Sequence, residues 1–399
     1  MSKQAPSTAS DPMVFSLIMW GEDSAAEGAI LLKSILMYTS GPVDIHVICN
    51  EVAQVYLEKR LALVKRPRYQ VLIRFYKPTW QDMLDRIERE GTIHTTHAAG
   101  TPGLMKLFIH EILPPSVKKA VFVDTDAYFI SDPYLLWDHF LHTLPSSTVI
   151  SMPTHPEMFA EQWFDANKIC SCIMLLDLEG LRRLRLMDSS FYRSVTPPLP
   201  VYSLPAFRAL FGPPSSQTGK YEEIALGDQS FWWAIIKYMN SEHETQKGMF
   251  EHLHYDWEVS SCLADMYITN MLPGQDDATE EDELKVQLHT WATPHQGEVI
   301  RPKLVHFNCL PGPRYYEWPG WDSAKDENTA GTEGLARRWG VSIKYHLGYK
   351  WLWLNRGPGH VAGPAESKNQ GSKIIIETVS NLKFADQLFG EQSTKTHNH

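Results

Sequence analysis

The sequence predicts an α/β protein in which a largely parallel sheet is covered by helices. In the first third of the chain, short apolar runs alternate with segments of helical spacing, which is typical of strand–helix–strand units. The apolar run at residues 120–123 shows no alternation of polar and apolar side chains, which indicates a strand buried on both faces. Such strands are typical of the interior of a parallel sheet.

Apolar spacing and helix-stopping residues define the elements of the first half. Apolar residues recur at helical spacing over 27–38, and Gly41-Pro42 ends that helix. Pro114-Pro115 ends the helix that precedes the strand at 120–123. The expected strands are 14–19, 43–49, 70–76 and 120–123, and the expected helices are 27–38, 52–63, 80–89 and 103–113.

The second half is less regular. Frequent prolines predict an irregular surface excursion over 196–216, and the acidic run at 274–283 predicts a solvated loop. The low hydrophobicity of residues 1–11 and of much of 358–399 predicts disorder at both ends. The expected ordered elements are strands at 170–177 and 303–307 and helices at 178–187, 227–239 and 336–354.

Composition places the chain among ordinary globular proteins and limits its partners. The 399 residues are 43% hydrophobic and 21% charged, with a net charge of −10 and a pI near 5.9. This acidic balance, without any Lys/Arg block, argues against a nucleic-acid partner. No apolar run approaches the roughly 18 to 20 residues of a membrane span.

The cysteines and the start of the chain bear on its compartment. The number of cysteines is odd and no Cys-x-x-Cys is repeated, so we expect free, mostly buried thiols in a reducing compartment. The first residues lack the charged-then-apolar layout of a signal peptide. The chain as given therefore predicts a cytoplasmic protein. The five cysteines are Cys49, Cys170, Cys172, Cys262 and Cys309.

Two carboxylates follow the strand at 120–123. In an open α/β sheet, ligands bind just beyond the carboxyl ends of the strands, and Asp124 and Asp126 supply hard oxygen ligands there. A divalent cation at this place is able to bridge to a phosphate, as a nucleotide-sugar glycosyltransferase requires when the diphosphate leaves.

The Asp-x-Asp pattern by itself leaves two other interpretations open. One is a strand end whose acids cap the next helix. The other is the strand of haloacid-dehalogenase phosphohydrolases, which also ends in Asp-x-Asp with a nucleophilic first Asp. That motif usually has Thr or Val where this chain has Tyr128, and it usually lies near the start of its domain. The phosphohydrolase is therefore a minor alternative.

Five segments in order resemble glycosyltransferase family 8. They are Leu31-Leu32-Lys33-Ser34-Ile35-Leu36, Gly103-Leu104-Met105-Lys106-Leu107, the Asp-x-Asp strand, Gly227-Asp228-Gln229 and Val305-His306-Phe307-Asn308. Within the family, the chain is most similar to the xylosyltransferase domain of the LARGE proteins and to the glucoside xylosyltransferases. The similarity runs from about residue 14 to about residue 355.

The resemblance implies a GT-A fold, with a Rossmann-like mixed sheet that is mostly parallel, forming a single domain over 12–357. It also implies a UDP-sugar donor of the UDP-xylose or UDP-glucose type, a glycan or glycoside acceptor, Mn²⁺ as cofactor and retention of the anomeric configuration. Relatives of this type work mostly in the Golgi lumen, held there by a membrane anchor. If the sequence given lacks an anchor that the whole protein has, the expected location is the Golgi instead of the cytoplasm.

The resemblance assigns roles to particular residues. Asp124, Asp126 and His306 match the metal ligands, and imidazole with carboxylates suits Mn²⁺ better than Mg²⁺. Asp228 and Gln229 match the catalytic pair near the sugar, although Asp228 also suits the N-terminus of a helix. The further donor-binding residues that the resemblance implies are Met19, Trp20 and Gly21 for uracil and ribose, with Lys106, Thr125, Ser171, Asn308 and Arg314.

Two departures from the family pattern affect the expected donor site. Cys170-Ser171-Cys172 stands where the family has Asn-Ser/Thr-Gly, and Gly312 stands where a diphosphate-contacting Lys is common. Arg314 is the substitute that we expect for that lysine, because its fork suits phosphate. The Cys-x-Cys pair by itself does not predict a soft-metal site, because it has no partner cysteines or histidines nearby in the sequence. A silent relative that only binds UDP-sugar, or only a protein partner, stays an alternative.

Overall fold

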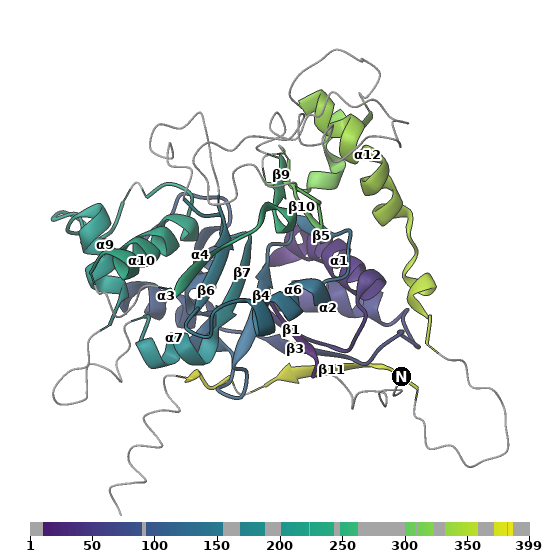
Figure 1. Ribbon diagram of the computed structural model, residues 1–399, viewed down its shortest axis with the longest axis horizontal. Helices are drawn as coiled ribbons and strands as arrows, with labels where there is room; N and C mark the ends of the chain where they lie inside the picture. Colours follow the sequence, from purple (N-terminus) through teal and green to yellow (C-terminus); the bar gives the residue numbers. More distant parts are fainter. Residues whose placement is uncertain are drawn as a thin grey trace, which may run out of the picture.

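A mixed sheet of eight strands organises the protein, as the computed structural model in Figure 1 shows. All neighbouring strands are parallel except β7, which runs antiparallel to β4 and β6. In order across the sheet, the strands are β11 (Ile374–Val379), β3 (Val71–Tyr76), β2 (Val43–Cys49), β1 (Met13–Met19), β4 (Lys119–Val123), β7 (Ile173–Asp177), β6 (Ile150–Pro153) and β8 (Phe250–Leu253).

The structure describes most of the chain between residues 11 and 385, with gaps. The described residues are 11–89, 93–154, 168–187, 201–222, 224–242, 248–261, 300–308, 310, 312–322, 332–357, 371–380 and 382–385. The acidic run expected at 274–283, together with Cys262 and Cys309, lies outside them. Among the helices within these ranges, none has the length and apolar character that crossing a membrane requires.

Helices cover both faces of the large sheet. Successive side chains of its central strands point to opposite faces, and because they are apolar on both faces, each face packs against helices. Val121 and Val123 of β4 face the core formed with α1 (Gly21–Tyr38) and α2 (Glu51–Leu61). Ala120 and Phe122 face the core formed with α3 (Trp80–Arg89), α5 (Ile109–Ile112) and α10 (Asp228–Glu242). This arrangement confirms the predicted α/β class, a mixed and mostly parallel GT-A type sheet with covering helices.

A second, small sheet lies against the carboxyl end of β4. It contains β5 (Ala127–Phe129), β10 (Leu304–His306) and β9 (Val259–Ser260), in that order. β10 pairs antiparallel with β5, so that His306 lies opposite Ala127. The helix α12 (Thr332–Gly348) contributes Trp339 and Ile343 to the core beside this sheet. The small sheet therefore brings a residue from late in the chain next to the Asp-x-Asp turn.

Several predicted elements match the observed ones closely, and others differ for local reasons. The strand at 43–49 and the helix at 80–89 have the predicted bounds. The helix expected at 27–38 begins at Gly21, because its acidic first turn carries no apolar spacing. The helix expected at 103–113 is three short pieces, α4 (Gly100–Leu104), a 3-10 turn (Met105–Phe108) and α5.

Two expectations for the second half were wrong where the structure describes it. The excursion expected over 196–216 contains α9 (Ser203–Phe211), because Pro205 falls in the first helical turn, where proline costs no hydrogen bond. The tail expected to be largely disordered contains β11, which pairs with β3 along its whole length. The strand expected from residue 170 begins at Ile173, so the residues before it form a turn.

Three of the predicted free thiols are confirmed. Cys49, Cys170 and Cys172 are reduced and buried. Burial raises the pKa of Cys49 to about 12, so this thiol stays protonated at neutral pH. Cys49 belongs to the core beneath α1 and α2, whereas Cys170 and Cys172 lie in the turn before β7.

One buried arginine fixes the segment that leads into β4. Arg182 lies on α7 (Leu178–Leu184) with only 7% of its surface exposed. Its guanidinium donates to the backbone carbonyls of His110 at 2.7 Å, Leu113 at 3.1 Å and Val117 at 2.9 Å. These carbonyls belong to α5 itself and to the segment after it, where no further turn of helix supplies N–H donors. Arg182 therefore takes the place of the missing turns of helix.

We expect Arg182→Leu to lower the free energy of unfolding by about 3 kcal/mol or more, because several buried carbonyls lose their donor at once. Urea unfolding followed by circular dichroism measures this change. Arg183→Leu is the matched control, since Arg183 lies next to it on α7 and is exposed. An equal decrease in the free energy of unfolding in the two variants would show that the buried hydrogen bonds of Arg182 do not stabilise the fold.

Candidate functional site

The Asp-x-Asp turn lies where the chain passes from the large sheet to the small one. Asp124 follows β4 directly, and Asp126 precedes β5. The backbone N–H of Asp124 donates to the carbonyl of Cys172 at 2.8 Å, and that of Phe307 donates to the carbonyl of Asp126 at 2.9 Å. The turn is thus held from both sides, by the segment before β7 and by the segment after β10.

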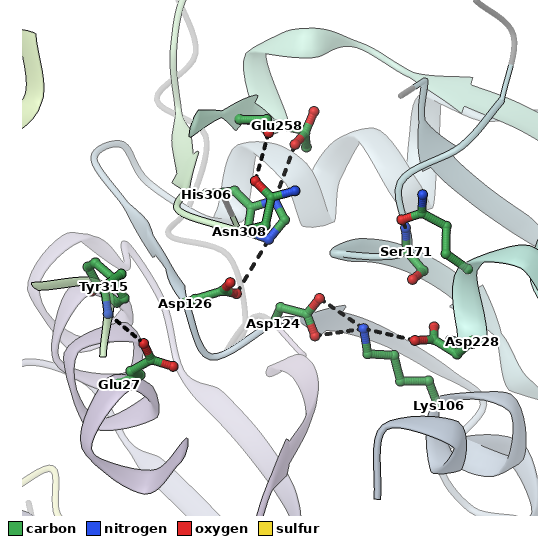
Figure 2. Close-up of polar contacts among 12 residues, drawn as sticks. Glu27, Lys106, Asp124, Asp126, Ser171, Asp228, Glu258, His306, Asn308 and Tyr315 are labelled. Carbon is green, nitrogen blue, oxygen red and sulfur yellow. Dashed lines mark hydrogen bonds and ion pairs between the residues drawn. The ribbon is translucent and has the colours of Figure 1, made fainter. Parts of the chain in front are cut away.

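Lys106 lies between two of the predicted site carboxylates (Figure 2). Its Nζ is 2.8 Å from Asp124 Oδ1 and 3.4 Å from Asp228 Oδ1. Burial lowers the pKa of Lys106, but Asp124 and Asp228 outweigh that effect and the net pKa is raised. Lys106 is therefore a charged lysine, and the ring of Phe122 lies 5.1 Å from its Nζ.

His306 lies between two other carboxylates, as Figure 2 also shows. Its Nε2 is 3.4 Å from Asp126 Oδ1, and its Nδ1 is 3.2 Å from Glu258 Oε1. His306 is 2% exposed and Glu258 is fully buried. Burial lowers the pKa of His306, but hydrogen bonds and charge from Asp126, together with Cys170 and Glu258, raise it well above its usual range. Without a cation, the imidazole therefore holds both protons.

The three predicted metal ligands come together. One ligand atom each from Asp124, Asp126 and His306 lies within 4.8 Å of the other two. Two carboxylates and an imidazole are a donor set that suits a divalent cation such as Mn²⁺. The residues present therefore fit a cation at this turn.

The site has more carboxyl groups than basic groups. Burial, opposed by Lys106, raises the pKa of Asp124 to about 7, and the nearby Asp126 adds to that rise. Burial also raises the pKa of Asp126, but His306 outweighs it and the net pKa is lowered. A divalent cation would neutralise the remaining surplus. The carboxyl groups are those of Glu27, Asp124, Asp126, Asp228 and Glu258, and the basic groups are those of Lys106 and His306.

Asp228 begins α10 after a strained turn. Leu226 and Gly227 both have left-handed backbones, with φ of 60° and 59°. A Cβ on Gly227 would lie 3.3 Å from the Cβ of His97. A larger residue is therefore disfavoured there both by this close contact and by the left-handed backbone. A left-handed leucine costs energy that the surrounding structure must offset. The turn aims Asp228, which is 6% exposed, toward Lys106.

Ser171 and Gln229 connect the turn before β7 with α10. The backbone N–H of Ser171 donates to Gln229 Oε1 at 3.3 Å. This contact joins the residue after Asp228 to the segment that also holds Asp124. Lys106, Asp124 and Asp228 form one ion-paired group, and burial raises the pKa of Asp228 while Lys106 and the Ser171 side chain oppose that rise.

The residues predicted for uracil and ribose lie at the start of α1. Met19 is fully buried, and its side chain packs against Gly28, where a Cβ would come within 2.3 Å of Met19 Cε. The side chain of Met19 therefore belongs to the core. Trp20 is half-buried beside Trp80, with ring centroids 6.3 Å apart. Gly21 has a φ of 87°, and its N–H donates to Asn50 Oδ1 at 3.1 Å.

Asn308 and Arg314, both predicted to bind the donor, have protein partners in this structure. Asn308 Oδ1 accepts a hydrogen bond from Ser260 at 2.8 Å, on the small sheet. Arg314 donates to Asp23 at 2.9 Å and to Glu317 at 3.2 Å. Arg314 therefore lies by the first turn of α1, and the structure pairs it with carboxylates.

Two residues of the site were missed in the sequence. Glu27 on α1 accepts a hydrogen bond from the Tyr315 N–H at 2.9 Å and another from the Thr125 side chain. Glu258 precedes β9 and contacts His306. Neither belongs to a motif, and the acidic residues of the first turn of α1 are Glu22 and Asp23 rather than Glu27. Their place in the site follows from the tertiary fold.

The fold and these groups define an α/β protein with a candidate cation site at the carboxyl ends of its parallel strands. No family model matches the sequence. The chain is similar to the Mus musculus xylosyl- and glucuronyltransferase LARGE2, with 34% identity over 128 residues, which are 31% of this chain and 18% of that protein. The Homo sapiens LARGE2 is 30% identical over 300 residues, 73% of this chain and 35% of that protein.

The predicted resemblance to the LARGE glycosyltransferases is thus confirmed, and the chain is their homologue. It spans about a third or less of the length of these relatives. Among solved structures, it is similar to mouse xyloside xylosyltransferase 1 in its apo form, with a TM-score of 0.46 and 15% identity, covering 74% of this chain and 98% of that one. The galactosyltransferase LgtC with donor and acceptor sugar analogs has a TM-score of 0.46 and 13% identity, covering 83% and 96%.

Glu27 makes cation binding depend on pH. Burial, followed by the charge of Asp126, raises the pKa of Glu27 to about 8, so the carboxyl is protonated at neutral pH while no cation is bound. A cation at Asp126 offsets this charge and expels the proton. We therefore expect cation affinity to rise between about pH 6 and pH 8, by up to about tenfold per pH unit for each proton released.

Isothermal titration calorimetry in buffers of different ionisation enthalpy measures the protons released. We expect Glu27→Gln to flatten the pH dependence and to release fewer protons. Glu22→Gln makes the same substitution at an exposed position on the same helix and serves as the control. If Glu27→Gln releases as many protons as the wild type, Glu27 does not take part in cation binding.

Proposed function

We propose that this chain is a retaining, Mn²⁺-dependent glycosyltransferase that moves a sugar from a UDP-sugar to a glycan or glycoside acceptor. The observation that carries the proposal is the grouping of Asp124, Asp126 and His306 within 4.8 Å at the carboxyl end of β4. Similarity to proteins named as xylosyl- and glucuronyltransferases supports the reaction class. Of the two predicted donor types, UDP-xylose and UDP-glucose, the xylosyltransferase in these names favours UDP-xylose.

Asp124, Asp126 and His306 would hold the cation, and Mn²⁺ is proposed because the set mixes oxygen with nitrogen. When bound, the cation supplies positive charge to the diphosphate as that group departs. Glu258 holds the imidazole from its other side at 3.2 Å and fixes its orientation.

Lys106 is proposed to bind the diphosphate. In this structure its ammonium group lies between Asp124 and Asp228, 8% exposed. A lysine has three donors, so it is able to keep Asp228 as a partner while it turns another N–H toward a phosphate oxygen. Lys106 would then link the leaving group to the carboxylate that faces the sugar.

Asp228 and Gln229 are proposed to act on the sugar. The bond from the anomeric carbon to the β-phosphate oxygen breaks, and the acceptor oxygen bonds to that carbon on the same face. The acceptor hydroxyl passes its proton to the departing β-phosphate oxygen. The Asp228 carboxylate would stabilise the positive charge that develops on the anomeric carbon, while Gln229 and Ser171 orient the sugar.

The nucleotide end of the donor is proposed to lie at the start of α1. Trp20 offers a ring face for uracil, and the backbone of Met19 and Gly21 would contact the base and ribose. Thr125 and Asn308 would line the diphosphate. Arg314 would replace the family lysine absent at Gly312, which requires it to leave Asp23 for the phosphate.

The other functions considered from the sequence receive less support. A phosphohydrolase of the haloacid-dehalogenase type finds no counterpart in the relatives named above, which are transferases. A silent relative is disfavoured because the ligand set of Asp124, Asp126 and His306 is intact and grouped.

We expect Asp126→Asn to weaken Mn²⁺-dependent UDP binding by about 100-fold or more, because it removes a charged ligand without changing the side-chain shape. Calorimetry with Mn²⁺ and UDP measures the change, and thermal unfolding checks the fold. Asp138→Asn is the control, because this carboxylate is 75% exposed on α6 (Tyr134–Asp138). Undiminished binding in Asp126→Asn would contradict the metal assignment.

We expect Asp228→Asn to leave the Kd for the UDP-sugar within about threefold while it lowers kcat by about 100-fold or more, because the carboxylate acts on charge that develops in the transition state. A panel of UDP-sugars with Mn²⁺, followed by UDP release and its loss on adding EDTA, supplies the assay. Unchanged kcat would exclude Asp228 from the catalytic group. No release and no binding with any donor would refute the proposed function as a whole.

A further inference from the structure

Four metal-ligating side chains, one of them His306, come together beside the Asp-x-Asp turn. One ligand atom each from Cys170, Cys172, Glu258 and His306 lies within 4.8 Å of the others. All four residues are buried, with exposed fractions of 0 to 2%. They come from three separate segments: the turn before β7, the residue before β9, and β10. The sequence pattern alone did not predict this group, because the partners of the two cysteines lie far away along the chain.

We propose that Cys170, Cys172, Glu258 and His306 form a second metal site, which takes a thiophilic divalent cation of the Zn²⁺ type. Two thiolates, a carboxylate and an imidazole make the four-coordinate set that Zn²⁺ prefers. With Zn–S near 2.3 Å and Zn–N near 2.0 Å, ligand atoms of a tetrahedral site lie roughly 3.3 to 3.8 Å apart. The observed group is therefore already close to the size that such a cation needs.

The two neighbouring sites differ in the cation that they select. Sulfur ligands favour Zn²⁺, whereas the Asp124 and Asp126 carboxylates favour a harder ion. The two rings of ligands meet at His306, whose Nδ1 faces Glu258 at 3.2 Å and whose Nε2 faces Asp126 at 3.4 Å (Figure 2). Binding of Zn²⁺ would release the two thiol protons and the Nδ1 proton to solvent. Nε2 would then donate its remaining proton to Asp126, or would release it to solvent when a cation binds at the carboxylate site.

The second site explains the departure at Cys170-Ser171-Cys172. A cation held by both cysteines would fix the turn before β7 to the small sheet through Glu258 and His306. That turn positions Ser171, whose N–H donates to Gln229 at 3.3 Å, and it accepts the Asp124 N–H at Cys172. The two cysteines would therefore hold the donor-facing turn in place by coordination.

Cobalt substitution tests this site without relying on activity. Protein purified under reducing conditions is analysed for zinc by mass spectrometry, then stripped with a chelator and titrated with Co²⁺. We expect about one tightly held zinc per chain, and near-ultraviolet bands from thiolate-to-cobalt charge transfer with the strong visible bands of a tetrahedral ion. Cys172→Ser should lose most of the charge-transfer band. Cys49→Ser, at another buried free thiol, should keep it.

Three results would contradict the second metal site. A wild-type Co²⁺ spectrum without thiolate bands, or a band unchanged in Cys172→Ser, would overturn it. A Cys170–Cys172 disulfide in freshly reduced protein would also overturn it, because a disulfide leaves no thiolate ligands. The wild-type spectrum decides the question even if a cysteine variant does not fold.

The proposed transferase function and the second site fail separately. Asp124→Asn removes a ligand of the carboxylate site only, so we expect it to keep the thiolate band while Mn²⁺-dependent UDP binding falls. A lost thiolate band in wild type with intact UDP binding would refute the second site alone. A preserved band without any UDP binding would refute the transferase proposal alone.

Discussion

The surplus of buried carboxylates around the turn between β4 and β5 is the constraint on which the rest of the site depends. Like charges that are taken out of water repel each other strongly, and a fold keeps them only with protons, basic groups or a cation. Lys106 and His306 each lie between two carboxylates and neutralise part of the charge. The raised pKa values of Glu27 and Asp124 reflect burial and the negative charge that these two basic groups do not neutralise. Under the proposed function a cation would supply the missing positive charge, and without one the raised pKa values keep protons at the site.

The two sheets are what keep these charges together. β4 ends in the large sheet, and three residues later β5 begins in the small one, so the turn has no freedom to relax. Antiparallel pairing of β10 with β5 fixes His306 opposite Ala127. On the other side, β7 pairs antiparallel with β4 and brings the Cys170–Cys172 turn within hydrogen-bonding distance of Asp124. The backbone hydrogen bonds of the two sheets thus hold the turn in place while Lys106 and His306 offset part of its charge.

Local patterns in the sequence were enough for the large sheet and for the Asp pair, because a buried strand and its carboxyl end are encoded by neighbouring residues. His306 was found only through the family resemblance, since the pairing that brings it to the turn joins residues far apart in the sequence, Ala127 and His306. Glu258 and Glu27 were out of reach because their roles depend on side chains brought near by the fold. The helix α9 and the strand β11 were missed because proline frequency and a polar tail outweighed short apolar runs.

Lys106 and a cation compete for the same carboxylate, and this competition couples metal binding to donor binding. Asp124 is 2.8 Å from Lys106 Nζ, so a cation that takes Asp124 leaves the lysine with Asp228 alone. A buried ammonium group that loses a counter-ion is costly, and an incoming diphosphate restores the balance. Under the proposed function, cation and nucleotide therefore each favour the binding of the other, as thermodynamic linkage requires. The lysine thus holds Asp124 and Asp228 together in the empty site, and once both ligands are bound it would bridge the diphosphate and Asp228.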